Sequence, residues 1–379
     1  MKDKIGIIDA DLLDKGTNFP NLALMKISSY FKNKGKTVDF LMSYNNFKEY
    51  DKVYVGKVFD FTKCVWNDEN KPKNVILGGS GFYFDKASFL DSEIEHSFPD
   101  YSLYPIEAIK NIKSKHSKQY YSDFSIGFLT RGCFRKCQFC INRNYNKVEK
   151  ASDLSEFVDE TKAKICLLDD NFWGYKNWKE EFLKLNKTNK KFQFKQGLDI
   201  RLLTEEKAEL LVNSKYEGDY IFAFDNYEEM SLIKQKLELW VKYWKKRKHR
   251  TKFYVLCAFK DNDIVDLVET FERVRLLLNY SCYPYIMKHK NFKTSKWRSI
   301  YTALSGWCNQ PRLLTKMRFK EYTILKSMGD FYKEYRHDWN KFLEDGHKKG
   351  KGWRVLEQFE KEYPEIAKDY FDMQFKNDT

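Results

Sequence analysis

Long hydrophobic runs are absent from this chain of 379 residues. No stretch reaches the roughly 18 apolar residues that indicate a membrane-spanning helix. The N-terminal sequence MKDKIGIIDADLL also lacks the apolar core and small-residue cleavage site of a secretory signal peptide. These absences predict a soluble, cytoplasmic protein with no membrane partner. The chain is too long for one small core, which predicts two or three domains.

Cysteines are few, and a reducing cytoplasm argues against a disulfide framework for the eight that occur. Three of them lie close together in TRGCFRKCQFC, as a C-x₃-C-x₂-C array formed by Cys133, Cys137 and Cys140. We expect the scattered ones to be buried and inert: Cys64, Cys166, Cys257, Cys282 and Cys308.

Two kinds of metal site compete for the array. A structural zinc site takes four ligands, typically as two cysteine pairs or a Cys/His set, and no second pair is present. An iron–sulfur cluster held by three thiolates is the other interpretation, and it leaves one iron open to a small ligand. The residues Arg131, Gly132, Arg135 and Lys136 around the cysteines also favour a loop that binds an anion.

The array, with TRGC before it and an aromatic residue before its last cysteine, resembles the signature of the radical S-adenosylmethionine (SAM) enzymes. The resemblance implies that Cys133, Cys137 and Cys140 hold a 4Fe-4S cluster whose fourth iron is chelated by SAM. It also implies that Phe139 lies against the adenine. The implied reaction is reductive cleavage of SAM to a 5′-deoxyadenosyl radical, which abstracts hydrogen from a substrate. An electron donor such as flavodoxin or ferredoxin is an implied partner.

Strand-like segments alternate with helical stretches after residue 118, which predicts parallel βαβ units. We expect helices over 152–164, with Ser152 as N-cap, and after Thr204. Six strands from SIGFLT to YPYIMKH fit the partial TIM-type (βα)₆ barrel of the radical SAM family, over residues 118–300. In such barrels the chemistry lies at the carboxyl ends of the strands.

Polar residues at those strand ends are the candidates for SAM binding. We expect Asp169 or Asp170, which are followed by Asn171, to meet the ammonium group of SAM. For the ribose and carboxylate of SAM, the candidates are Gln196, Asp199 and Arg201. Asp225, at the end of the next strand, is a further candidate. Helix capping or loop solvation is the alternative role for each of them.

Residues 1–105 predict a doubly wound, Rossmann-like domain that resembles the cobalamin-binding domain of many radical SAM enzymes. We expect its first helix to start at Pro20 and stop at Gly35. The family's cobalamin motif is Asp-x-His-x-x-Gly, and Leu13 stands at the histidine position of the stretch from Asp11 to Gly16. The sequence therefore predicts that no histidine-ligated cobalamin is bound, and that this domain is vestigial or handles substrate.

The net charge of +14 is unevenly distributed along the chain. Residues 231–300 hold 17 Lys and Arg against 6 Asp and Glu. The run KYWKKRKHRTK within this stretch is expected on the solvated end of a helix. The segment KHKNFKTSKWR, directly after the last predicted strand, interleaves cations with aromatics and contains no acid. Such a composition is typical of single-strand nucleic-acid contacts. The predicted contact residues are Lys288, Lys290, Phe292, Lys293, Lys296, Trp297 and Arg298.

The predicted function is therefore radical modification of a nucleic-acid base or nucleotide. Modification of a peptide or small metabolite is a second hypothesis. A metal-stapled nucleic-acid-binding protein without catalysis is a third. Residues 301–379 are expected to form an aromatic-rich helical extension.

Overall fold

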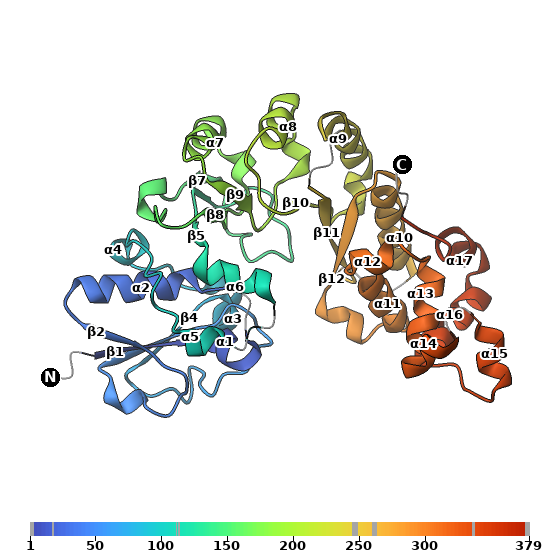
Figure 1. The fold of residues 1–379 in the computed structure, drawn as a ribbon, viewed down its shortest axis with the longest axis horizontal. Helices are drawn as coiled ribbons and strands as arrows, with labels where there is room; N and C mark the ends of the chain where they lie inside the picture. Colours follow the sequence, from blue (N-terminus) through green and yellow to red (C-terminus); the bar gives the residue numbers. More distant parts are fainter. Residues whose placement is uncertain are drawn as a thin grey trace. The chain divides into compact units, whose positions relative to one another are not determined.

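The computed structural model describes residues 4–16, 19–110, 112, 114–244, 249–259, 264–335 and 338–375. The chain divides into two compact units. The first unit comprises Met1–Gln196 and Lys215–Glu217, and the second comprises Gly197–Ser214 and Gly218–Thr379. Each unit contains parallel β-sheet, and the second ends in a group of helices (Figure 1). Among the described helices, none combines the length and the apolar character needed to cross a bilayer.

The first unit begins with a four-stranded parallel sheet in the order β2-β1-β3-β4. Its strands are β1 (Lys4–Asp9), β2 (Thr37–Phe40), β3 (Lys52–Gly56) and β4 (Val75–Gly78). The chain order reverses between β1 and β3, and ligands of open α/β sheets bind at the carboxyl ends of strands beside such a reversal. The helices of this part are α1 (Ala10–Lys15), α2 (Leu22–Asn33), α3 (Ser80–Tyr83), α4 (Ser92–Glu95) and α5 (Ile106–Ile109).

Helix α2 covers one face of this sheet, where Leu24 and Ile27 pack with Ile5 and Ile7 (Figure 1). A second core cluster, which includes Val53 and Trp66, draws on the 41–50 and 64–66 segments. The expected helix start at Pro20 is wrong, because the N-cap is Asn21, whose side chain accepts from the Leu24 amide. The stop is close to Gly35, since α2 ends at Asn33.

The remainder of the first unit is a three-stranded parallel sheet in the order β5-β8-β9. A short antiparallel pair, β6 with β7, follows β5 in sequence. The elements are α6 (Lys115–Ser122), β5 (Phe124–Gly127), β6 (Thr130–Arg131), β7 (Glu149–Lys150), β8 (Lys164–Leu167), α7 (Trp178–Lys187) and β9 (Lys191–Phe194).

The second unit contains another three-stranded parallel sheet, in the order β10-β11-β12. Its elements up to the last strand are α8 (Glu205–Val212), β10 (Tyr220–Ala223), α9 (Met230–Tyr243), β11 (Thr251–Cys257), α10 (Ile264–Asn279) and β12 (Tyr283–Lys288). The helices that follow are α11 (Arg298–Cys308), α12 (Pro311–Leu314), α13 (Phe319–Ser327), α14 (Tyr332–Tyr335), α15 (Trp339–Glu344), α16 (Lys351–Glu362) and α17 (Pro364–Tyr370).

The mixed α/β class, the parallel strands and the helical C-terminal region agree with the sequence-based expectation. The six strands expected for the barrel are present as two three-stranded sheets, and their closure into one partial barrel stays a prediction. The Thr204 N-cap is present, because its side chain accepts from the Lys207 amide. The basic run at 242–252 falls partly outside the described residues.

The helix expected over 152–164 is wrong, because the segment forms only one turn, η3 (Leu154–Glu156), capped by Asp153. The ring of Phe157 lies against Gly127, where an added Cβ would come within 2.3 Å of the ring. The hydroxyl of Tyr101 donates to the Phe157 carbonyl at 2.6 Å. Contacts with distant parts of the chain therefore hold this segment in an irregular conformation.

The two compact units differ from the three domains expected at 1–105, 118–300 and 301–379. The first unit joins the N-terminal sheet to β5, β8 and β9, and the second joins β10–β12 to the C-terminal helices. The three-domain division stays a prediction.

Candidate metal centre

The three clustered cysteines lie in a loop of residues 132–148, the cysteine loop, which leaves the sheet at β6 and returns at β7. Antiparallel pairing of Thr130 with Lys150 closes its base. Gly132 opens the loop with a φ of 95°, and a Cβ there would lie 2.4 Å from the Lys147 carbonyl oxygen. This combination of left-handed backbone and close approach requires glycine immediately before Cys133.

The thiols of Cys133, Cys137 and Cys140 are half-buried, and none is in a disulfide. The Asn171 side-chain amide donates to the Cys133 sulfur at 3.4 Å. The backbone N–H of Asn142 donates to the Cys140 sulfur at the same distance. N–H groups aimed at sulfur are the contacts that tune iron–sulfur clusters.

Within the described residues, no three Cys, His, Asp or Glu side chains converge as a single metal ion would require. In a 4Fe-4S cluster each thiolate binds a different iron, so the three thiols need to surround a cluster without meeting at one point. Three thiols on one loop, with N–H donors to two of them, match the donor set of such a cluster.

Asp169, at the carboxyl end of β8, secures the base of the cysteine loop. Its carboxylate accepts from the Thr130 N–H and hydroxyl, each at 2.7 Å, and from the Leu129 N–H at 3.2 Å. Burial raises the pKa of Asp169 to about 7. Both carboxylate oxygens are therefore engaged by the protein, and the expected contact with the ammonium group of SAM stays a prediction.

Asp170 spans the cysteine segment itself. One of its oxygens accepts from the Gly132 N–H at 2.8 Å, and the other accepts from the Asn142 side-chain amide at 2.6 Å. Burial raises the pKa of this carboxyl group. Because Gly132 precedes Cys133 and Asn142 follows Cys140, Asp170 fixes both ends of the segment that carries the thiols.

Asn171 is the contact residue to which sequence reasoning assigned no role. Only 3% of it is exposed, and its amide nitrogen reaches Cys133. Its side-chain oxygen is buried with no hydrogen-bond partner among the described residues. A buried, unsatisfied acceptor beside a candidate cluster ligand fits a group that arrives with the cofactor. The available signal was its place as the third polar residue after an apolar strand.

Phe139 is half-buried and Gln196 is exposed in the first unit. In the second unit, Arg201 binds Asp199 in a bidentate ion pair at 2.6 and 3.0 Å. It also binds Glu229 at 2.6 Å. Asp225 accepts from the Leu256 N–H at 2.9 Å, and burial raises its pKa to about 6. These contacts are those of capping and packing, and the expected roles in SAM binding stay predictions.

The basic segment after β12 does not form one continuous surface. Trp297 is only 3% exposed and packs on Phe359 and Tyr363, at ring-centroid distances of 4.8 and 5.9 Å. Its expected stacking on a nucleic-acid base is therefore wrong for this structure, because the C-terminal helices cover the ring. Lys296 pairs with Glu362 at 2.5 Å. Lys290 and Lys293 are exposed in a turn, η7 (Lys290–Lys293).

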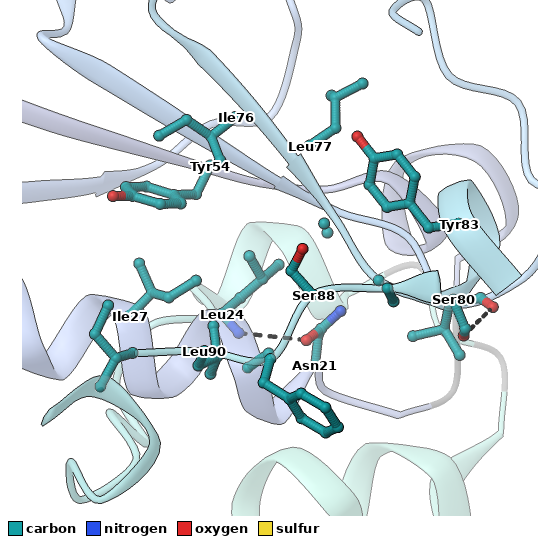
Figure 2. A pocket seen from close by; sticks show the side chains of 18 of the residues that line it. Asn21, Leu24, Ile27, Tyr54, Ile76, Leu77, Ser80, Tyr83, Ser88 and Leu90 are labelled. Atoms are coloured by element: carbon teal, nitrogen blue, oxygen red, sulfur yellow. Dashed lines mark hydrogen bonds between the residues drawn. The ribbon is translucent and has the colours of Figure 1, made fainter. Parts of the chain in front are cut away.

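A pocket of about 620 Å³ lies in the first unit, beside β3 and β4 (Figure 2). Tyr54 and Ile76 lie on its sheet side, and Leu24 and Ile27 lie on its α2 side (Figure 2). The cysteine loop also contributes to the wall, through Ile141, Asn142 and Tyr145, and Arg131 of β6 lies beside them in the lining. Residues of the N-terminal sheet and of the segment that carries the thiols therefore line the same pocket.

The cysteine loop is tied to the 84–91 segment, which also lines this pocket. Arg143 pairs with Asp85 at 2.7 Å, and the Asn144 amide donates to the Asp85 carbonyl at 3.2 Å. The wall formed by the cysteine loop is therefore held by an ion pair and a hydrogen bond.

No protein-family model matches this chain, and no curated protein matches it in sequence. By structure it is similar to the radical S-adenosylmethionine methyltransferase TsrM from Kitasatospora setae, solved with cobalamin and a 4Fe-4S cluster bound. The TM-score is 0.50 at 12% sequence identity, over 76% of this chain and 75% of that chain. At this identity the likeness shows a shared fold, of parallel α/β sheets with a helical C-terminal region.

The expectation against cobalamin is contradicted by this likeness, because the TsrM structure has cobalamin bound. That expectation rested on the leucine at the histidine position of the family motif. Here the stretch forms helix α1, and Leu13 packs against the core cluster that contains Val53 and Trp66. The residue at this position therefore contributes to the core of the domain.

Proposed function

We propose that this protein is a radical SAM enzyme whose cluster is held by Cys133, Cys137 and Cys140. The observation that carries the proposal is the cysteine loop, with three thiols between two anchored ends and N–H donors to two sulfurs. The fold shared with TsrM supports it. When bound, a 4Fe-4S cluster with SAM supplies the electron that generates a 5′-deoxyadenosyl radical.

The chain's own residues have separate tasks in this proposal. Asp169 and Asp170 hold the cysteine loop in place through its backbone and through Asn142. Asn171 positions Cys133 and presents its unsatisfied oxygen to the polar groups of SAM. Phe139 packs against the adenine, and a flavodoxin- or ferredoxin-type protein delivers the electron.

The decisive experiment is anaerobic reconstitution with iron and sulfide, followed by SAM cleavage under dithionite. We expect a brown protein with about four iron and four sulfide per chain that releases 5′-deoxyadenosine. Replacement of Cys133, Cys137 or Cys140 by alanine should abolish both properties. Cys64→Ala is the matched control, since Cys64 is similarly half-buried but lies outside the loop. A colourless, zinc-containing protein without SAM cleavage would instead support a metal-stapled binding protein.

For the substrate we retain the proposal of a nucleic-acid base or nucleotide. It is supported by Lys288, the last residue of β12, and Arg298, the first residue of α11, which have no acidic partner among the described residues. Conversion of a base in a single-stranded oligonucleotide, followed by nucleoside mass spectrometry, tests it. Hydrogen abstraction from a peptide or metabolite alone would favour the other substrate class.

We further propose the pocket beside β3 and β4 as a corrin site. A corrin ring has apolar edges and amide side chains, and the pocket offers Tyr54 and Ile76 together with the polar side chains of Asn21 and Ser80. Gly78 lines the pocket with nothing within 4 Å of an added Cβ, so Gly78→Leu fills the space without a backbone clash.

Desalting after incubation with hydroxocobalamin measures this binding by absorbance. The wild type should retain corrin, and Gly78→Leu should lose it while keeping its iron. Val65→Leu, at an exposed position outside the pocket, is the control. Retention of corrin that Gly78→Leu does not diminish would place the site elsewhere.

A further inference from the structure

A second cavity, of about 650 Å³, lies entirely within the second unit and has a cationic lining. Four basic residues from separate elements line it: Lys288 of β12, Arg298 of α11, Lys326 of α13 and Lys351 of α16. None of its lining residues is acidic. Four positively charged residues in a lining without an acidic residue create a field that attracts polyanions.

These four cations are distinguished from neighbouring lysines by their lack of acidic partners. Lys296 pairs with Glu362 and Lys349 with Glu357, each at 2.5 Å, and Lys320 pairs with Glu360. Across the part of the chain that the structure describes, the lining cations make no such ion pair: Lys288, Arg298, Lys326 and Lys351. The C-terminal helices thus neutralise the lysines outside the cavity and leave those that line it uncompensated.

The rest of the lining adds the hydroxyl group of Ser299, which can donate to a phosphate. The hydroxyls of Thr302 and Ser327 also line the cavity, but they donate to the Arg298 and Thr323 carbonyls. The cavity also reaches the start of α16, a twelve-residue helix whose N-terminal Lys351 and Gly352 belong to the lining. The N–H groups and dipole at a helix N-terminus favour an anion, in addition to the side-chain charges.

Two aromatic side chains complete the cavity. Phe292 is half-buried in the wall, with the Lys288 ammonium 4.6 Å from its ring centroid. Tyr322 of α13 also lines the cavity, and a Cβ added at Gly306 would lie 2.4 Å from its hydroxyl oxygen. An aromatic ring beside unpaired cations is the arrangement that accepts a base next to its phosphate.

We propose that this cavity binds the phosphate groups of a nucleotide, either free or within a single strand. Lys326, Lys351 and Arg298 contact the phosphates, and Phe292 stacks on the base. The claim that the bound nucleotide is the enzyme's substrate rests on the proposed radical chemistry. Phosphate binding by the cavity is measured without SAM, so failure of SAM cleavage and failure of this inference are distinguishable.

The structure also revises which part of the basic segment takes part. Of the residues expected from the sequence to contact nucleic acid, Lys288, Phe292 and Arg298 line the cavity. Two of its cations, Lys326 and Lys351, come from the C-terminal helices and were not among the predicted contact residues.

The test uses fluorescence anisotropy of the full-length protein with a labelled 12-nucleotide single-stranded DNA, and with a labelled nucleoside triphosphate. We expect Lys326→Ala/Lys351→Ala to weaken binding at least tenfold. For DNA, the slope of log K against log salt should flatten by about 1.4, since two phosphate contacts are lost. Loss of affinity for DNA alone would identify a strand site, and loss for both probes would identify a nucleotide site.

The matched control is Lys320→Ala/Lys349→Ala, which removes the same charge from two lysines paired with glutamates. This variant should bind within about twofold of the wild type, because neither lysine lines the cavity and exposed ion pairs contribute little. Equal loss in both double variants, or equally tight binding of a polyglutamate peptide, would overturn the inference in favour of unspecific charge attraction. Absence of binding to either probe at low salt would overturn it as well.

Discussion

The side-chain amide of Asn171 donates a hydrogen bond to the sulfur of Cys133 across 3.4 Å, from the end of β8 to the cysteine loop. A residue that follows an apolar strand is thereby linked to a thiol 38 positions earlier in the chain. The link makes the electronic properties of the candidate cluster depend on a residue that is not a ligand.

Asn171→Leu should therefore make the cluster harder to reduce. Loss of one N–H donor to a thiolate sulfur removes about 1 kcal/mol of stabilisation of the reduced state, which corresponds to roughly 40 mV for one electron. A redox titration followed by electron paramagnetic resonance measures the shift. Asn213→Leu, a change at the end of α8, is the control. An unchanged potential in Asn171→Leu would contradict the assigned contact.

Gly132→Ala should prevent the cysteine loop from closing. The residue has a φ of 95°, and its Cβ would lie 2.4 Å from the Lys147 carbonyl oxygen. The left-handed backbone alone costs about 1–2 kcal/mol for alanine, and the collision adds to it. Iron content after reconstitution should fall by at least half. Gly16→Ala carries a similar backbone strain, with a φ of 60° and nothing near its Cβ, and should keep its iron.

Trp297→Ala should destabilise the fold, because its ring is buried against Phe359 and Tyr363. Truncation of a buried tryptophan costs about 3–5 kcal/mol, which urea unfolding will measure. Phe292→Ala, in the wall of the cationic cavity, should instead weaken nucleotide binding by about 1–3 kcal/mol through lost stacking. The opposite assignment of the two effects would mean that Trp297 is accessible in solution.

Asp9 should make stability depend on pH, because burial raises its pKa to about 6. It accepts from the Leu12 N–H and from the Tyr104 hydroxyl at the end of β1. For a carboxyl group whose pKa is raised on folding, stability is full below the unfolded value of about 4 and is lost as the pH rises through about 6.

Asp9→Asn should abolish this loss, because it removes the buried charge. The variant should match the wild type near pH 4 and exceed it by about 2–3 kcal/mol at pH 8, in urea unfolding. The control Asp60→Asn, at an exposed position, should follow the wild type. A gap that stays constant with pH would show that Asp9 is ionised throughout.

Much of the fold could be predicted from local sequence patterns. The strand segments from KIGIID to YPYIMK are apolar runs bounded by turn residues, and they form the expected strands β1 and β12. The cap at Thr204 was also predictable, because its contact with Lys207 lies within one turn. The absence of a helix at 152–164 could not be predicted, because it depends on a contact between Phe157 and Tyr101, which are distant in the sequence.

The sequence by itself determined the cysteine spacing, the parallel βαβ pattern and the concentration of positive charge, because these are properties of neighbouring residues. Only the tertiary structure decided which side chains are already engaged and which stay available. It placed Asp170 on both sides of the three thiols, buried Trp297 under helix α16, and brought Lys326 and Lys351 to the same cavity as Arg298. The physical reason is that hydrogen bonding, burial and charge pairing depend on residues that are distant in the chain and meet only in the fold.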